Sequence, residues 1–283
     1  MKIIDLHTHS NKSDGSMTPT ELILHSKACG LSAIALTDHD TADGICEARA
    51  AAQKADIEFI AGIEFAAYYK EKEIHIVGLF IDETNEAFAA ATKQMAEERN
   101  ERNLRIIQQM QAAGIDISAE ALYAEEGSGI LTRANFANCL LRRGIVSSIN
   151  EAFKKYLDYG KPFYVPRKKM PVGAAINHIH HAGGIAVLAH PLLYHFSDTE
   201  LDTCVAALKN DGIDALESYY SRNALFDTGR LKALAAKYGL LNSGGSDFHG
   251  TYKPDIAIGR GTGNLVVPYD VLEKLKAYQS NAF

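Results

Sequence analysis

The sequence contains no tryptophan, few cysteines and no hydrophobic run long enough to span a membrane. Its four cysteines include no Cys-x-x-Cys pair, which argues against a thiolate zinc site and against a disulfide framework. Scattered reduced thiols are typical of a cytosolic protein. No signal-peptide pattern precedes the first strand-like segment. We therefore expect a cytoplasmic protein that does not associate with membranes. The cysteines are Cys29, Cys46, Cys139 and Cys204.

The composition is that of an ordinary soluble protein, but the charge is unevenly distributed. A length of 283 residues, with 47% hydrophobic and 23% charged residues, suits one large α/β domain or one such domain with an insertion. The net charge of −6 argues against a general nucleic-acid coat protein. Residues 133–169 nevertheless carry nine basic and two acidic side chains, a net charge of +7, which leaves −13 for the rest. That basic segment suits an anionic substrate, or it forms a solvated helical face.

Short strand-like runs alternate with helical patterns along most of the chain. Such alternation predicts a parallel sheet, and seven strands predict a closed or nearly closed α/β barrel. The expected strands are 3–6, 33–37, 59–64, 74–80, 185–189, 215–219 and 241–247. The expected helices are 19–30, 43–55, 198–212, 224–239 and 269–278.

The alternation stops between about residues 83 and 169. Long helical patterns cover 87–114, 134–143 and 150–159, with no convincing strand between them. We predict a barrel formed by residues 1–82 and 170–283, and an all-helical insertion at 83–169 that caps the substrate site. Within the insertion, the row of Arg99, Arg102 and Arg105 is interpreted as pairing with Glu98 and Glu101 at helical spacing rather than as binding residues.

Histidines and carboxylates recur where the expected strands end. His7 and His9 are separated by one residue after the first strand, so their side chains point the same way. In barrels of parallel strands, the C-terminal strand ends converge on one mouth. His75 is the exception, because it lies near the beginning of its strand. The metal-ligand candidates are His7, His9, Asp14, His39, Glu64, His75, His190, Asp247 and His249.

This donor set predicts the chemistry. Imidazole and carboxylate without sulfur indicate Mn, Fe or Zn. Nine ligands exceed the capacity of one ion, so we expect two or three divalent transition-metal ions, with Glu64 as the best bridging residue. Such ions generate a hydroxide nucleophile and neutralise charge on phosphoryl oxygens. No serine or cysteine nucleophile with a base partner is evident, which favours attack by metal-bound hydroxide. The predicted catalytic residues are Asp14, His39, Glu64, His190 and His249.

Further carboxylates near the strand ends are expected to support the ligands. Asp5, Asp38 and Asp40 are predicted to orient ligating imidazoles. Glu217 lies in the sixth expected strand and either lines the pocket or holds a ligand in place.

As a set, the motifs resemble those of the PHP (polymerase and histidinol phosphatase) superfamily. The resemblance implies a distorted (β/α)7 TIM-like barrel with two or three metal ions at its mouth. It is strongest to stand-alone phosphoesterases with a helical insertion, a branch that includes nucleoside 3′,5′-bisphosphate phosphatases and 5′-to-3′ exonucleases acting on short RNA. The motifs are Asp5-x-His7-x-His9, Ser13-Asp14-Gly15, Thr37-Asp38-His39-Asp40, Gly62-x-Glu64, Ala189-His190-Pro191 and Ser246-Asp247-x-His249.

The resemblance also implies roles for individual residues. Arg133 would bind the substrate phosphate, and Asn135 stands where relatives carry a second phosphate-facing residue, a histidine. Arg167 belongs to a further family-like segment and is the third predicted substrate-binding residue. The implied metal sets are His7, His9, Glu64 and Asp247 for one ion, Glu64, His75 and His190 for a second, and Asp14, His39 and His249 for a third.

We therefore predict a metal-dependent phosphoesterase that acts on a nucleoside 3′,5′-bisphosphate, a mononucleotide or the 5′ end of short RNA. A histidinol-phosphate-type phosphatase is the nearest alternative, but the basic segment suits a more highly phosphorylated ligand. An amidohydrolase-like C–N hydrolase would need a strand-end lysine as metal bridge, and no good candidate is present. A non-catalytic metal-binding PHP module is favoured only by Asn135. Nothing in the sequence indicates a stable protein partner.

Overall fold

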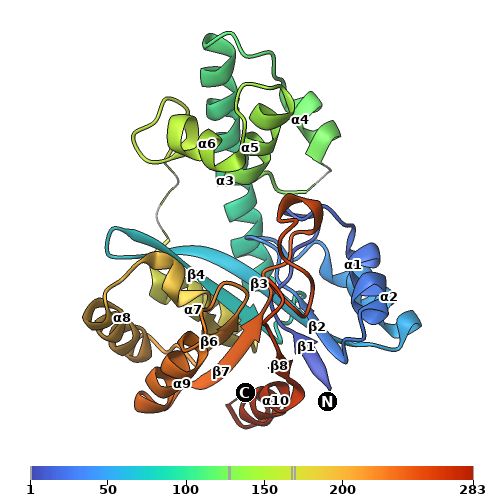
Figure 1. Cartoon of the computed structure of the whole chain (residues 1–283), viewed down its shortest axis with the longest axis vertical. Coiled ribbons are helices and arrows are strands. Elements are labelled where there is room, and N and C mark those ends of the chain that lie inside the picture. Colours follow the sequence, from blue (N-terminus) through green and yellow to red (C-terminus); the bar gives the residue numbers. More distant parts are fainter. Residues whose placement is uncertain (1, 127–128, 167, 169, 283) are drawn as a thin grey trace.

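The computed structural model describes residues 2–126, 129–166, 168 and 170–282. An eight-stranded sheet, with strand order β7-β6-β5-β4-β3-β2-β1-β8, forms a nearly closed barrel surrounded by helices (Figure 1). The strands are β1 (Ile3–Asp5), β2 (Ala33–Leu36), β3 (Glu58–Tyr69), β4 (Lys72–Leu79), β5 (Ile185–Leu188), β6 (Ala215–Tyr220), β7 (Leu241–Gly245) and β8 (Val267–Pro268).

Most helices follow the predicted pattern with small shifts at their ends, whereas the helices at 119–126 and 172–181 have no counterpart among the expected ranges. Around the barrel lie α1 (Pro19–Ala28), α2 (Ile45–Ala55), α7 (Val172–His181), α8 (Asp198–Asn210), α9 (Asp227–Lys237) and α10 (Tyr269–Ala282). Short 3-10 turns are η2 (Pro191–Tyr194) and η3 (Gly250–Tyr252). Above the barrel lie α3 (Glu86–Ala112), α4 (Ala119–Glu126), α5 (Arg133–Arg142), α6 (Ile149–Ala152) and a π-helical turn η1 (Phe153–Leu157).

The prediction of an all-parallel sheet is wrong for one strand. β4 runs antiparallel to both β3 and β5. Only Lys70 and Glu71 separate β3 from β4, and a two-residue connection reverses the chain, whereas a parallel crossover needs a dozen residues or more. The short strand β8, antiparallel to β1, was not predicted.

The barrel closes where the chain continues beyond β1 and β7. The Leu6 amide donates to the Gly244 carbonyl over 3.1 Å, and the Asp247 amide donates to the His7 carbonyl over 2.8 Å. The two backbones approach so closely at Gly245 that a Cβ there would lie 2.4 Å from the His7 nitrogen. Glycine is therefore required at this position.

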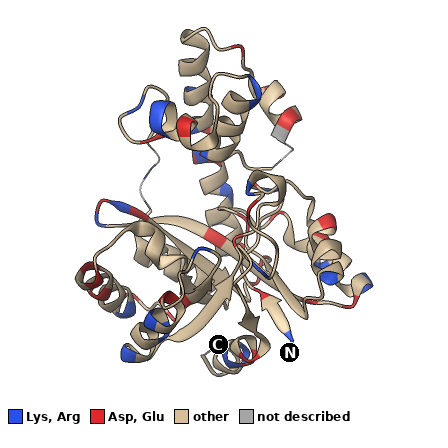
Figure 2. Ribbon diagram, in the orientation of Figure 1, with Lys and Arg blue, Asp and Glu red and all other residues tan. Residues whose placement is uncertain are grey.

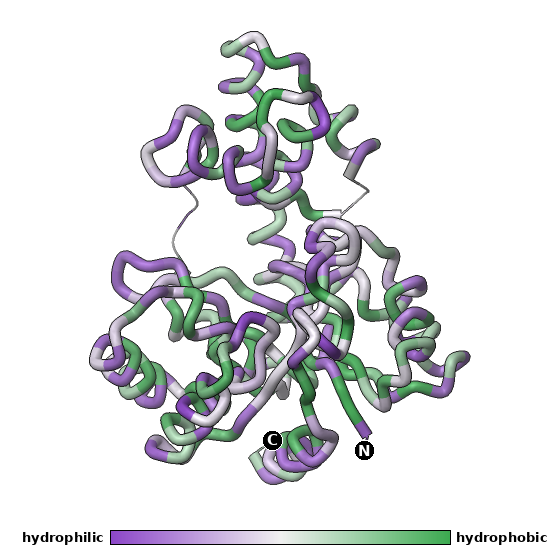
Figure 3. The backbone as a smooth tube through the Cα atoms, in the orientation of Figure 1, coloured by the Kyte–Doolittle hydropathy of each residue, from purple (hydrophilic) through white to green (hydrophobic). Residues whose placement is uncertain are grey.

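Apolar strands hold the barrel together. Every residue of β2 and β5 is buried, and β1 forms a hydrophobic segment beside the N-terminus (Figure 3). Helix α1 starts as the sequence predicts, with a Thr18–Glu21 capping box and Pro19 in its first turn. No helix among the described residues is long and apolar enough to cross a membrane.

The upper helices pack around an apolar cluster of their own. Phe136 and Leu140 of α5 meet Ile106 and Met110 of α3 in that cluster. The first half of α3 instead packs Phe88 against the barrel helices. Helix α3 therefore spans both parts of the molecule and runs past the mouth of the barrel (Figure 1).

Candidate metal centre

The structure brings all nine predicted ligands together at the mouth of the barrel. Each ligand lies in a strand or in the loop that follows one, and these segments meet at the mouth. The ligands are therefore close in space although 242 positions separate His7 from His249. Their ligand atoms form four overlapping groups, and within each group all atoms lie within 4.8 Å of one another. The groups are His9, Asp14, His39 and His249; His7, Glu64 and His190; His7, His9 and Asp247; and His39, Glu64 and His75.

The reversed direction of β4 explains the placement of His75. Its position near the start of a strand looks anomalous in a parallel barrel, where the strands end at the mouth. In the antiparallel β3–β4 pair, His75 lies opposite Ala66, two residues beyond Glu64. The beginning of β4 therefore faces the same mouth as the ends of its parallel neighbours.

Glu64 is the centre of the constellation. Its Oε1 lies 2.9 Å from His75 Nδ1 and 3.0 Å from His190 Nε2. Its Oε2 lies 3.0 Å from His39 Nδ1, and 3.4 Å from both His7 Nε2 and His9 Nε2. The side chain is fully buried, and burial opposes its charged form. The surrounding imidazoles outweigh burial and hold the pKa of Glu64 well below its ordinary value.

A second carboxylate gathers the outer histidines. Asp14 Oδ1 lies 3.3 Å from His249 Nε2, and its Oδ2 lies 3.7 Å from His39 Nε2. The Thr132 hydroxyl donates to the same Oδ2 over 3.0 Å, which connects the start of α5 to this side of the centre. A contact with the backbone sets the tautomer of His249. Its Nδ1 lies 2.8 Å from the Asp247 carbonyl oxygen, which leaves Nε2 facing Asp14.

Two supporting carboxylates act on the backbone and on hydroxyl groups, not on imidazoles as predicted. Asp38 accepts from the hydroxyls of Ser10 and Ser13, both over 2.6 Å, and so holds the loop that carries Asp14. Burial raises the pKa of Asp38 to about 7. Asp5 accepts from the amides of Ser246 and Gly259, which fixes the segments after β7. The prediction for these two carboxylates was therefore wrong.

Glu217 is the carboxylate that orients a ligand. Its Oε1 lies 2.9 Å from His7 Nδ1, which directs His7 Nε2 toward Glu64. Its Oε2 accepts from the His190 amide over 2.6 Å. The sequence leaves two interpretations open for Glu217, lining the pocket or holding a ligand in place, and the contact with His7 supports the second. Partners of this kind fix the orientation of metal-bound imidazoles.

Two contacts to Asp247 were not predicted from the sequence. The Tyr220 hydroxyl donates to Asp247 Oδ2 over 2.9 Å, and Lys253 Nζ donates to the same oxygen over 2.8 Å. Both residues lie outside the recognisable motifs, so no sequence signal indicated them. Asp247 itself adopts a positive φ of 56°. Such a conformation in a non-glycine residue costs about 1–3 kcal/mol and is common at functional sites.

The polar atoms at this centre fit a divalent cation. Deeply buried nitrogens and oxygens in proteins are almost always hydrogen-bonded. Here His7 Nε2, both ring nitrogens of His9, His190 Nδ1 and Glu64 Oε2 are buried without a hydrogen-bond partner. Leaving such atoms unsatisfied is costly, and metal coordination, through one nitrogen of each imidazole and through the Glu64 oxygen, removes most of that cost. The residues present therefore suit metal ions in this position.

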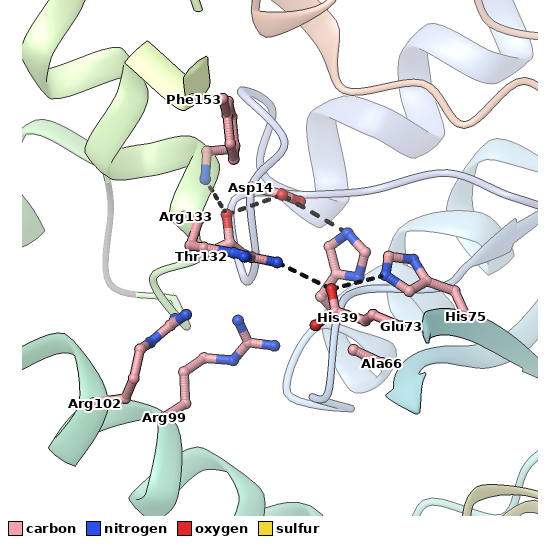
Figure 4. Close-up of a pocket in the computed structure, with 11 residues that line it drawn as sticks. Asp14, His39, Ala66, Glu73, His75, Arg99, Arg102, Thr132, Arg133 and Phe153 are labelled. Carbon is pink, nitrogen blue, oxygen red and sulfur yellow. Dashed lines mark hydrogen bonds and ion pairs between the residues drawn. The ribbon is translucent and has the colours of Figure 1, made fainter. Parts of the chain in front are cut away.

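A pocket of about 170 Å³ lies beside the centre and extends under the upper helices (Figure 4). His39 and His75 line it from the barrel, and Arg133 lines it from α5. Asn135 is not among its lining residues: the side chain is buried and its Oδ1 accepts from the Thr132 amide over 2.7 Å, which caps α5. The third predicted substrate residue, Arg167, lies outside the described residues.

The fold and the site together define an α/β barrel with a histidine- and carboxylate-rich metal centre at its mouth. Residues 5–165, more than half of the chain, match the model of the PHP domain. The chain therefore belongs to the PHP domain family.

Curated relatives and solved structures agree with this assignment. The chain is 37% identical to the 5′-3′ exoribonuclease Rnm of Escherichia coli, covering 87% of this chain and 85% of the relative. It is also 37% identical to a 3′,5′-nucleoside bisphosphate phosphatase of Chromobacterium violaceum, covering 88% of both chains. A solved structure of an amidohydrolase from C. violaceum, with bound sulfate and no metal, has a TM-score of 0.85 and 34% identity, covering 97% of this chain and 96% of its own.

Proposed function

We propose that this protein is a metal-dependent phosphoesterase that hydrolyses a phosphate ester of a nucleotide-like substrate. The observation that carries the proposal is the buried Glu64 carboxylate, surrounded by five imidazoles and bordered by an arginine-lined pocket. The two relatives named above act on a nucleoside bisphosphate and on RNA, as their names state. Both substrate types contain phosphate esters of nucleotides.

The ligand groups support two or three divalent ions of Mn, Fe or Zn. His7, His9, Glu64 and Asp247 would hold one ion, Glu64, His75 and His190 a second, and Asp14, His39 and His249 a third. When bound, the ions supply a Lewis acid that activates water and neutralises charge on the phosphoryl oxygens. Glu64 touches ligands of every set and is the proposed bridge. Glu217 keeps His7 in the orientation that this arrangement needs.

The upper helices, residues 83–169, are the proposed cap over the substrate. Thr132 reaches Asp14, and Arg133 Nη2 lies 3.0 Å from Glu73 Oε1 across the pocket. Arg133 is 28% exposed on its side chain, so it remains accessible to an incoming phosphate. A guanidinium provides two parallel donors for phosphate oxygens. Only part of the basic segment faces the pocket, because Arg142 and Arg143 pair with Glu125 away from it.

The alternatives fit this geometry less well. A C–N hydrolase of the kind considered would place a lysine between its metals, but Glu64 occupies the central position here. A histidinol-phosphate-type substrate carries one phosphate, whereas the pocket presents Arg99, Arg102 and Arg133. A module without turnover would not need all nine ligands to converge.

A phosphate-release screen tests the proposal. Metal-loaded protein would be incubated with nucleoside 3′,5′-bisphosphates, mononucleotides, short 5′-phosphorylated RNA, histidinol phosphate and p-nitrophenyl phosphate, beside an amide and a lactone. We expect the highest kcat/KM among the nucleotide-like substrates and no turnover of the amide or the lactone. A clear preference for histidinol phosphate would contradict the assignment of a nucleotide substrate. Turnover of the amide alone would show that the protein is a C–N hydrolase and not a phosphoesterase.

We expect Asp14→Asn to lower the metal content by about one ion per chain. The structural alternative is a simple Asp-Gly turn, but both oxygens of Asp14 face histidines of the outer group. Losing the carboxylate charge weakens that group while Glu64 and the inner histidines remain. Elemental analysis of the variant and of wild type measures the difference. Asp56→Asn, on a fully exposed side chain, is the matched control. Unchanged metal content together with unchanged activity would favour the turn.

A further inference from the structure

Asp247 divides its two carboxylate oxygens between different kinds of partner. The two other candidate carboxylate ligands, Glu64 and Asp14, direct both of their oxygens toward imidazoles. Asp247 directs only Oδ1 toward imidazoles, at 3.3 Å from His9 Nε2 and 3.4 Å from His249 Nδ1. Asp247 therefore faces the other candidate ligands through a single oxygen.

Two hydrogen bonds occupy the other oxygen of Asp247. The Tyr220 hydroxyl donates to Oδ2 over 2.9 Å, and Lys253 Nζ donates to it over 2.8 Å. A carboxylate oxygen offers about two lone-pair sites, so these two donors fill Oδ2. Asp247 is only 5% exposed, which leaves little room for water to replace either donor. An ion at this position is therefore left with Oδ1.

Tyr220 is held firmly at the end of β6. Its side chain is buried, and its ring lies 5.6 Å from the His190 ring. The next residue, Ser221, donates its hydroxyl to the Ser246 carbonyl over 2.5 Å. The end of β6 thus contacts the backbone just before Asp247 as well as the Asp247 carboxylate.

Lys253 reaches the same oxygen from the loop after β7. The 3-10 turn η3 folds the chain back toward Asp247, and the Lys253 amide donates to the Gly250 carbonyl over 3.3 Å. Figure 2 shows basic positions in this loop, above the mouth of the barrel. The Lys253 side chain is 35% exposed, so water can replace its contact more easily than that of Tyr220. The buried hydroxyl is therefore the more firmly placed of the two donors.

The backbone of Asp247 shows why these contacts matter. Its φ of 56° lies in the left-handed region, where a non-glycine residue stays only when the surrounding structure holds it. The Asp247 amide donates to the His7 carbonyl over 2.8 Å, which fixes the main chain. The orientation of the carboxylate depends in addition on the donors to Oδ2.

We propose that Tyr220 is a positioning residue of the metal centre, which keeps Asp247 Oδ1 directed at the ion that Asp247 shares with His7 and His9. The proposal rests on the metal centre of the function proposed above. Lys253 is the second donor to the same carboxylate oxygen, so the two donors support each other. Tyr220 acts through Asp247 and not on the substrate, so its effect is expected in the affinity for one ion.

The test measures how much Mn²⁺ the full-length protein retains during titration with a chelator of known affinity. Tyr220→Phe removes the hydroxyl and keeps the ring beside His190. The affinity for one Mn²⁺ per chain should fall roughly tenfold, and the affinity for any other ion should change by less than about threefold. Tyr219→Phe is the matched control, because Tyr219 precedes Tyr220 on β6 and places its ring 5.5 Å from Lys232 Nζ. The control should retain Mn²⁺ as wild type does. Unchanged Mn²⁺ affinity in Tyr220→Phe, with or without a lower Tm, would overturn the positioning role.

A second comparison repeats Tyr220→Phe in a Lys253→Met background. No donor to Asp247 Oδ2 then remains, so the loss of affinity caused by Tyr220→Phe should grow to roughly a hundredfold. The comparison does not depend on the effect of Lys253→Met by itself, because the lysine charge also acts directly on a nearby ion. An equal loss in both backgrounds would contradict shared support of one oxygen.

Metal retention separates failure of the Tyr220 role from failure of the proposed function. If wild type binds Mn²⁺ but hydrolyses no phosphate ester, the phosphoesterase function fails, and Mn²⁺ retention by Tyr220→Phe still decides the positioning role. If wild type hydrolyses phosphate esters and Tyr220→Phe retains Mn²⁺ equally well, the positioning role fails and the phosphoesterase function remains. A wild type that retains no ion would contradict both.

Discussion

Replacement of His9 or Asp247 by alanine is expected to reduce phosphate-ester hydrolysis to background while the barrel stays folded. His9 belongs to two of the four ligand groups, and its Nε2 lies 3.3 Å from Asp247 Oδ1. Removing either side chain therefore disrupts the same metal position. Neither residue belongs to the apolar clusters that hold the strands together. The measurement is kcat with added Mn²⁺, together with the Tm of each variant.

His181→Ala is the matched control for this experiment. His181 lies on α7, is exposed and takes no part in the ligand groups. Its variant should keep the wild-type kcat and Tm. If His9→Ala or Asp247→Ala retains a near wild-type kcat with added metal, the proposed site is wrong. A large fall in Tm alone would mean that the residue supports folding, and metal content of the folded fraction would then separate the two effects.

Arg133→Ala is expected to lower kcat/KM for a nucleoside bisphosphate by more than for p-nitrophenyl phosphate. A charge-assisted phosphate contact contributes about 1.5–3 kcal/mol, which corresponds to roughly ten- to a hundredfold. The truncation also leaves Glu73 without its Arg133 partner in the pocket, where its carboxylate would repel a substrate anion. Both effects act in the same direction. Steady-state kinetics on the two substrates measure the difference.

Arg142→Ala on the same helix serves as the control for Arg133. Its guanidinium pairs with Glu125 and lies away from the pocket. Surface ion pairs of this kind contribute little to stability, about 0–1 kcal/mol, so the variant should fold and turn over normally. Equal losses for both substrates in the Arg133 variant would mean that Arg133 acts at the cleaved phosphate or on folding, and not on additional anionic groups.

The strand-end motifs made much of this centre predictable from the sequence. His7-x-His9 and Asp247-x-His249 follow strands that end at the same mouth, so alternation and barrel geometry suffice to bring them together. Helix α1 was equally predictable, because its capping box and its first-turn proline are local sequence signals. The nine candidate ligands converge as expected, but their assignment to individual ions stays a prediction.

Other features depend on tertiary contacts that no local pattern reports. The direction of β4 follows from the two-residue turn at Lys70 and Glu71, which the strand pattern alone did not reveal. The burial of Arg99 and Arg102 depends on where α3 passes the barrel, and helical spacing cannot indicate that. The contacts to Asp247 come from Tyr220, at the end of β6, and from Lys253, six residues further along the chain, and neither residue belongs to a motif.

The metal content of the purified protein tests the central claim most directly. Protein grown and purified without chelator would be analysed for transition metals, and phosphate release would be measured on the same sample. We predict more than one ion per chain, with Mn, Fe or Zn predominating, and loss of hydrolysis when the ions are removed. One ion or fewer per chain in an active sample would contradict a centre in which Glu64 bridges several ions.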